Sequence, residues 1–109
     1  MRRRDYLGQF ELMVLLAVIR VGDDAYGVPI ARELEAASAS EVGIGSVYAA
    51  LERLEAKGLV SSRVGDPTPE RGGRAKQYFE VTSAGRRAAR DARRTFTRLW
   101  EPDLKGRTA

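Results

Sequence analysis

The sequence contains neither cysteine nor histidine among its 109 residues. Without cysteine the chain forms no disulfide and offers no thiolate to a metal, and without histidine it lacks the commonest metal ligand and the commonest general base. Its longest uninterrupted apolar run, Leu12 to Ile19, has eight residues, whereas a membrane-spanning helix needs about 20. Metal sites, catalysis that relies on a histidine base and a membrane span are therefore not expected.

Two other patterns that can indicate catalysis lack the features that a site requires. Gly72-Gly73 beside Arg71 resembles an anion-binding loop, but no Gly-Lys-Ser/Thr sequence follows it and no helix begins there. Asp23 and Asp24 are adjacent at a turn, so their carboxylates point apart instead of facing each other across a cleft. We therefore expect no enzyme, no catalytic residue and no cofactor.

The length of the chain favours a single domain with one hydrophobic core. At its start, Arg2 to Arg4 are followed by Asp5, with no separate hydrophobic region and no cleavage site. This pattern does not resemble a signal peptide. We expect residues 1–6 to be a short, disordered basic leader and the protein to be cytoplasmic.

Charge is distributed unevenly along the chain. Residues 1–55 carry six basic and nine acidic side chains, a net charge of −3, whereas residues 56–109 carry thirteen basic and six acidic side chains, a net charge of +7. A basic surface attracts polyanions through counterion release, which is independent of sequence and sensitive to salt. Charge alone does not distinguish DNA from RNA or from an acidic protein.

Apolar residues cover most of the circumference of the first predicted helix, residues 7–21. A helix of this kind needs cover on two sides, and one small domain supplies only one of them. We therefore predict that a second subunit covers the other side. The apolar positions of the first helix are Leu7, Phe10, Leu12, Val14, Leu15, Leu16, Val18 and Ile19.

A second helix is predicted over residues 27–37. Pro29 is compatible with it, because proline is tolerated in the first turn of a helix.

Glycines bound a third predicted helix at about residues 45–57. Gly43 and Gly45 precede its apolar repeat, and Gly58 follows it, where a left-handed residue ends a helix at little steric cost. Its apolar residues recur at i, i+4 and i+7 and therefore share one face. That face contains Val47, Leu51 and Leu54, while Ser46, Ala49, Ala50 and Arg53 lie on or beside the opposite face.

The outer face of this third helix is small and polar. A DNA major groove about 12 Å wide admits a helix whose short side chains allow close approach, while one or two longer donors reach base edges or phosphates. Ser46, at the amino-terminal end, adds a hydroxyl next to free N–H groups that suit a phosphate oxygen. The segment therefore has the properties of a recognition helix for duplex DNA.

Two short strands follow, at residues 59–64 and 76–81, and they are predicted to pair as an antiparallel hairpin. The segment between them, GDPTPERGGR, contains two prolines and three glycines, a composition that favours a mobile loop. This loop carries Arg71 and Arg74. The order of elements predicts a mainly α protein with a small β-hairpin, arranged as a winged helix-turn-helix.

The last predicted helix begins after Thr82, a suitable N-cap, and stops before Pro102. Arginines cover most of it, and the remaining apolar stripe has little of its own chain to pack on. We therefore interpret residues 83–101 as a dimerisation helix that pairs with the first and last helices of a second copy, and residues 102–109 as a tail. The predicted interface residues are Phe10, Val14, Ala92, Phe96, Leu99 and Trp100.

The segment GSVYAALERLEAKGLV resembles the recognition-helix region of PadR-type transcriptional regulators. LGQFELMVLLAV and AYGVPIARELE resemble the first two helices of that family, and GRAKQYFEVTSAG resembles its second wing strand and the start of its last helix. The resemblance covers roughly residues 7 to 90 in the expected order, and four segments in register are specific where one is not. It implies a winged-helix DNA-binding domain over residues 7–82. The wing tip is longer and richer in proline and glycine than the family's usual Gly-Arg-centred tip.

The resemblance implies a homodimeric regulator that binds a pseudo-palindromic operator in double-stranded DNA, and we expect it to be a repressor. Tyr48 has two compatible roles, since its ring can lie in the core while its hydroxyl reaches a phosphate. Wing tips commonly follow the phosphate backbone or the minor groove. The expected DNA contacts are Gly45, Ser46, Tyr48, Ala49, Arg53, Arg71, Arg74 and Lys76.

Some members of the PadR family bind flat aromatic compounds between their subunits. By resemblance, a small aromatic effector is therefore expected as a partner, with Trp100 as the ring that stacks on it. Two other interpretations remain open. The basic winged helix can serve as an interaction module for an acidic protein partner, or it can bind RNA.

Overall fold

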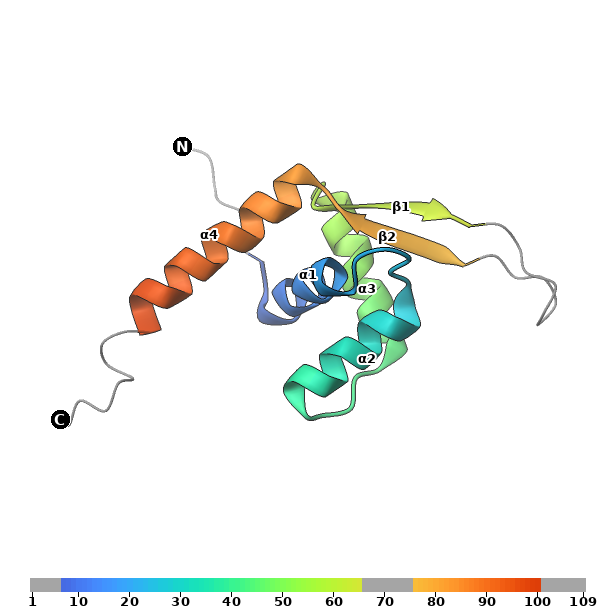
Figure 1. The fold of residues 1–109 in the computed structure, drawn as a ribbon, viewed down its shortest axis with the longest axis horizontal. Coiled ribbons are helices and arrows are strands. Elements are labelled where there is room, and N and C mark those ends of the chain that lie inside the picture. The colour runs from blue at the N-terminus through green and yellow to red at the C-terminus, as the bar shows by residue number, and fades with distance from the viewer. Residues whose placement is uncertain (1–6, 66–75, 101–109) are drawn as a thin grey trace.

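The computed structural model describes residues 7–65 and 76–100, and Figure 1 shows the path of the chain. Its helices and strands lie within two residues of the predicted bounds, and the predicted fold class, mainly α with a small hairpin, is confirmed. In chain order the elements are α1 (Gln9–Val21), α2 (Gly27–Ser38), α3 (Ile44–Ala56), β1 (Val60–Val64), β2 (Gln77–Val81) and α4 (Ser83–Trp100).

The hydrophobic core lies between the first three helices. α1 packs against both α2 and α3, and these two also contact each other. Its largest fully buried side chains come from all three helices and from β1, and a contiguous core of this kind is the main stabilising feature of a small domain. They include Leu15, Ile30, Leu51, Leu54 and Val60.

The hairpin is joined to this core through its second strand. β1 and β2 pair antiparallel from Val60 opposite Val81 to Val64 opposite Gln77. The backbone N–H of Phe79 also donates to the carbonyl oxygen of Ala25 at 2.7 Å, and the Phe79 side chain is buried in the core. The base of this β1–β2 hairpin, which we call the wing, is therefore fixed to the segment that precedes α2.

Thr82 fixes the start of α4, as predicted. Its side-chain oxygen accepts a hydrogen bond from the backbone N–H of Gly85 at 3.0 Å, which is the N-cap geometry. The same hydroxyl donates to the carbonyl oxygen of Gly58 at 2.7 Å. Gly58 has a φ of +76°, the left-handed conformation expected at the end of α3. One threonine thus connects the end of α3 to the start of α4.

Gly85 lies where α4 crosses the chain that enters β1. A Cβ at this position would overlap the carbonyl oxygen of Leu59 and lie 2.8 Å from a methyl group of Val81. Because a backbone atom cannot move aside as a side chain can, only glycine fits without a shift of α4.

We therefore expect Gly85→Ala to destabilise the fold by about 1–3 kcal/mol, the usual effect of overpacking. Urea unfolding followed by circular dichroism measures this change. Gly8→Ala is the matched control, because nothing lies within 4 Å of a Cβ at Gly8. Equal stability of the two variants would show that α4 does not approach Leu59 as closely as described.

α4 leaves the base of the hairpin and extends away from the wing, past α1 (Figure 1). A groove of about 470 Å³ lies between α1 and α4, and it is mostly apolar. Close to its outer end, large apolar side chains stay in solvent: Phe96 is 51% exposed, Leu99 73% and Trp100 58%. The groove is lined by Leu12, Leu16, Ile19, Arg86, Ala89, Arg90, Ala92, Arg93, Phe96 and Thr97.

One predicted interface residue needs correction. Val14 is completely buried in the chain's own core, so it offers no surface to a second copy. The side of α1 that faces the groove contains Leu12, Leu16 and Ile19, which recur at i, i+4 and i+7. Phe10 is partly buried against the core, and Ala92 lies in the groove wall.

None of the described helices is long and apolar enough to cross a membrane.

Candidate nucleic-acid interface

The exposed face of α3 has small side chains, as the sequence predicts for a recognition helix. Gly45, Ser46 and Ala49 are exposed on it. Ala50 is wholly buried beside the apolar repeat, so its predicted place on the outer side is wrong. Two further exposed residues, Ile44 and Glu52, belong to the accessible surface of α3. Ile44 can contact a thymine methyl group, and Glu52 can accept a hydrogen bond from the cytosine amino group.

α3 begins in a way that leaves backbone donors accessible. Its N-cap is Gly43, which has no side chain to accept from the first turn of the helix. The exposed Ser46 hydroxyl lies in that same first turn. Amide groups at the start of a helix attract anions because of their free N–H groups and the helix dipole. The start of α3 therefore has the chemistry that suits a DNA phosphate.

Tyr48 lies between α3, α2 and the hairpin. Its ring packs so closely on α2 that a Cβ at Gly27 would lie 2.6 Å from the ring. On another side it faces Phe79, with ring centroids 6.4 Å apart. Tyr48 is only partly buried. Its ring therefore belongs to the packing of the domain, and any contact with DNA is limited to its accessible edge.

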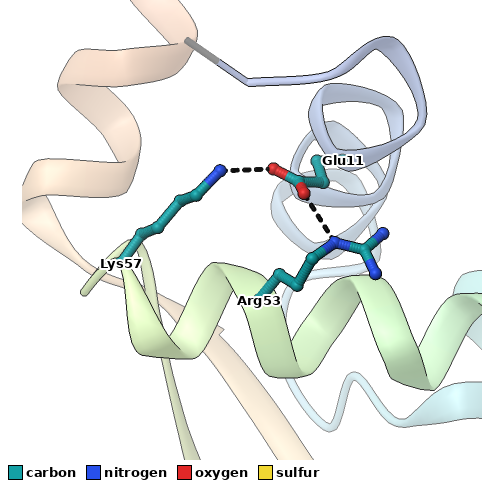
Figure 2. A network of polar contacts seen from close by, with 3 residues as sticks. All are labelled: Glu11, Arg53 and Lys57. Atoms are coloured by element: carbon teal, nitrogen blue, oxygen red, sulfur yellow. Dashed lines mark hydrogen bonds and ion pairs between the residues drawn. The ribbon is translucent and has the colours of Figure 1, made fainter. Parts of the chain in front are cut away.

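Arg53 does not extend freely from α3. Its Nε donates to Glu11 Oε2 of α1 at 2.6 Å, while Lys57 Nζ lies 2.7 Å from Glu11 Oε1 (Figure 2). Glu11 is the buried charged residue of the described chain, with 9% of its surface exposed. Both of its oxygens are thus paired with cations at the end of α3, Arg53 in its last turn and Lys57 at its C-cap. The pairing fixes the C-terminal half of α3 to α1.

This pairing changes the acidity of the carboxyl group. The hydrogen bond from Lys57 holds the pKa of Glu11 below its ordinary value of 4.5, and the bond from Arg53 acts in the same direction, although burial opposes both. A carboxyl group with a lower pKa in the folded state binds its proton less readily than it does in the unfolded chain. Its contribution to stability is therefore complete above the unfolded pKa and is lost as the pH falls through the folded pKa.

We expect Glu11→Gln to lower the free energy of unfolding by about 1–2 kcal/mol at neutral pH, because charged hydrogen bonds are lost. The difference between wild type and variant should start to shrink as the pH falls below about 4.5, and it should be lost once the pH has passed the lower pKa of the folded state, where the native carboxyl group is protonated as well. Urea titrations at neutral and at acid pH measure it. A difference that is the same at both values would contradict the lowered pKa.

At the base of the wing, two cations lie over two tyrosine rings. Lys76 Nζ is 4.4 Å from the centre of the Tyr26 ring, and the Arg63 guanidinium is 4.7 Å from that of Tyr78. The rings meet edge to face, with centroids 5.8 Å apart. Arg63 also lies 3.6 Å from Asp24. Contacts of this kind hold basic groups at defined positions. Lys76, which is exposed and directly precedes β2, therefore presents its charge from a defined position at the base of the wing.

Arg71 and Arg74 lie outside the residues that the structure describes, and so do the basic leader and the tail. Four residues of this site were not predicted from the sequence: Glu11, Lys57, Ile44 and Glu52. Glu11 had a detectable signal, because it is an acidic residue within a helix that is otherwise apolar nearly all round. The partners of Glu11 lie 42 and 46 residues away, so spacing alone did not reveal them.

Basic side chains also cover α4 around its apolar stripe, and Arg86, Arg90 and Arg93 line the α1–α4 groove. The helix carries six exposed arginines, and its single acidic residue, Asp91, pairs with Arg94 at 2.6 Å. This surface extends the positive charge of the second half of the chain. Among residues 7–65 and 76–100 there is no cluster of acidic side chains that could hold a metal ion.

The three-helix core, the hairpin after the exposed helix and the cations at the hairpin's base define a winged helix-turn-helix protein. The model of the transcriptional regulator PadR-like family matches residues 15–91. The chain belongs to this family. It is therefore a DNA-binding transcriptional regulator and not an enzyme.

The chain is also similar to several solved structures. H. salinarum RosR is 28% identical, with a TM-score of 0.65 over 88% of this chain and 80% of that one. A PadR family regulator from Clostridium difficile is 22% identical, with a TM-score of 0.66 over 84% of this chain and 91% of that one. A transcriptional regulator from Clostridium thermocellum is 18% identical, with a TM-score of 0.70 over 90% and 92%. The last two likenesses concern the fold alone. No curated protein matches the chain.

Proposed function

We propose that the protein is a repressor that binds a pseudo-palindromic operator as a homodimer. The observation that carries this proposal is the exposed face of α3, where small residues precede Arg53. A face of this shape allows the backbone of the helix to approach base edges closely. The proposal thus extends the general role of the family to a defined surface of this chain.

Within each half-site, α3 lies in the major groove. Gly45, Ser46 and Ala49 approach the bases, and the accessible edge of Tyr48 and the side chain of Arg53 face the flanking strand. Lys76 contacts phosphate from the base of the wing, and on sequence grounds Arg71 and Arg74 continue this contact along the backbone or the minor groove.

Exposed apolar surface supports the dimer. Phe96, Leu99 and Trp100 are all more than half exposed on α4, and Phe96 lines the groove together with Leu16 of α1, which is 46% exposed. A monomeric protein rarely leaves a contiguous apolar surface of this kind in water. A second copy that places its own α1 and α4 there buries both surfaces at once. Two-fold symmetry then predicts two half-sites, about one or two helical turns apart.

The α1–α4 groove also supports a small aromatic effector. Its walls are mainly apolar, and Phe96 supplies an aromatic ring. Trp100 lies one turn further along α4, outside the groove of a single chain, so it meets the effector only at the edge of a dimer. A titration with planar aromatic dyes that are neutral or anionic tests this site, because three arginines line the groove. Quenching of tryptophan fluorescence supports it, and unchanged fluorescence across the series contradicts it.

These proposed roles divide the chain into four parts. Residues 7–82 form the DNA-binding unit, residues 83–101 form the dimerisation helix, and residues 1–6 and 102–109 flank them as leader and tail. A regulator of this class acts where the chromosome is, so we place it in the cytoplasm.

Selection of bound sequences from a random pool of duplex DNA tests the function. The protein should enrich one sequence with two related half-sites, and bind random duplex weakly with a steep dependence on salt. Enrichment of a single asymmetric half-site would contradict the dimer. An adaptor for an acidic protein would show only the weak, salt-sensitive component, and an RNA-binding protein would prefer RNA in direct competition.

A further inference from the structure

Glu11 is a charged residue in an apolar setting. It lies on α1 among residues that form the core or the α1–α4 groove, and it is 9% exposed. Burial of a carboxylate is costly, and an apolar side chain of similar size often stabilises a fold as well as a buried ion pair does. Packing alone therefore does not explain this residue.

The contact between Glu11 and Arg53 uses only one edge of the guanidinium group. Arg53 donates through Nε, and an arginine carries five N–H donors, so four remain on its two terminal nitrogens. Figure 2 shows these nitrogens directed away from Lys57, while Glu11 faces the Nε side. The Arg53 side chain is 52% exposed although it is paired. The guanidinium group is thus held through Nε, while about half of the side chain stays accessible.

We propose that Glu11 is a positioning residue for DNA binding, which holds Arg53 through Nε so that its two terminal nitrogens grip one backbone phosphate of the operator. This inference rests on the proposed function. A guanidinium group matches the oxygens of a phosphate with two parallel N–H bonds. Because Glu11 has already fixed the plane of the group, less side-chain freedom is lost when the phosphate arrives. Lys57 occupies the other oxygen of Glu11 and prevents the carboxylate from turning away.

A positioning role and a simple charge effect predict opposite results. Glu11 is an anion close to a polyanion, so its neutralisation should strengthen binding to every duplex if only its charge matters. If Glu11 orients Arg53, the contact forms only where the protein sits in one fixed register on the backbone, as it does on the operator. The same change should then weaken binding to the operator, while random duplex, which is bound in many registers by charge alone, should bind equally well or more tightly. The ratio of the two affinities therefore separates the roles, and a merely structural role would not change it in folded protein.

The experiment uses the full chain and the duplex that wild-type protein selects from a random pool. Glu11→Gln keeps the size of the side chain and removes its charge, and we expect it to lower the ratio of selected to random affinity about tenfold. Glu33→Gln is the matched control, because Glu33 pairs with Arg20 at 2.6 Å between α1 and α2, in a contact that does not involve α3. This control should leave the ratio unchanged.

Two variants of Arg53 complete the test. Arg53→Lys keeps the charge but loses the planar fork, and it should lower the ratio as much as Arg53→Ala does. In an Arg53→Ala background, Glu11→Gln should have no further effect on the ratio. A Glu11→Gln ratio equal to wild type, the same loss in both backgrounds, or wild-type behaviour of Arg53→Lys would overturn the proposal. Arg53 is largely exposed, so its variants decide the matter even if Glu11→Gln does not fold. Failure of the wild-type protein to select any duplex would instead overturn the proposed function.

Discussion

Phe96→Asp is expected to convert the protein from a dimer into a monomer and to lower its affinity for the operator by about 10²- to 10⁴-fold. Phe96 contributes the aromatic ring of the α1–α4 groove and remains half exposed in the single chain. A second copy that covers this groove would bury the ring, so an aspartate there would remove the apolar contact and place a charged, hydrated group in the interface. Loss of the dimer also removes the gain in affinity that comes from linking two half-sites.

Analytical ultracentrifugation measures the mass of the variant, and a gel-shift titration measures its affinity. Thr95→Asp is the control, since this residue precedes Phe96, is exposed and does not line the groove. The control should remain dimeric. A Phe96→Asp protein that sediments as a tight dimer would show that the subunits meet elsewhere.

Ala49→Glu is expected to abolish preference for the selected duplex, with a loss of about 10²- to 10³-fold in affinity. Ala49 is exposed on α3, where a short side chain permits close approach to base edges. A carboxylate in a groove lined by acceptors and phosphates introduces like charges, which cost several kcal/mol. Fold stability should change by less than about 0.5 kcal/mol, because the site is on the surface of a helix.

The control for this change is Ala36→Glu, which adds the same charge at an exposed position of α2. It should retain the selected sequence and most of the affinity. Equal losses in the two variants would mean that net charge decides binding, and the assignment of α3 as the recognition helix would be without support.

Local signals predicted the elements of this fold well. Gly58 adopts the left-handed conformation that ends α3, and Thr82 caps α4 through the backbone of Gly85. Period and capping are properties of neighbouring residues, so one sequence was enough to place these helices. The contact that demands glycine at residue 85 depends instead on the carbonyl group of Leu59, which comes close only after the chain folds.

Orientation was harder to predict where a helix is apolar nearly all round. Val14 and Leu16 have similar hydrophobicity, yet Val14 is completely buried and Leu16 is 46% exposed. The apolar pattern of α1 does not indicate which side of the helix faces α2 and α3, so the interface prediction at Val14 was wrong. Ala50 was misplaced for a related reason, because a small side chain suits both the core and a DNA-facing surface.

The structure shows a contact at the predicted site that the spacing of residues in the sequence did not reveal. Arg53 was expected to reach toward DNA from α3, and the structure adds a carboxylate from α1 that holds it. The ion pair joins residues that are far apart in sequence, and only the packing of α1 on α3 brings them together. The predictions for Gly45, Ser46, Ala49 and Lys76 as DNA contacts remain predictions, and each of these residues is exposed.

If the exposed face of α3 recognises a particular duplex sequence, the protein distinguishes that sequence from others of the same charge. Competition at fixed salt between the selected duplex and a scrambled duplex of equal length and composition measures this. We expect the selected duplex to bind about 10³-fold more tightly. Equal affinity for the two duplexes would contradict it, because attraction between charges would then explain all of the binding.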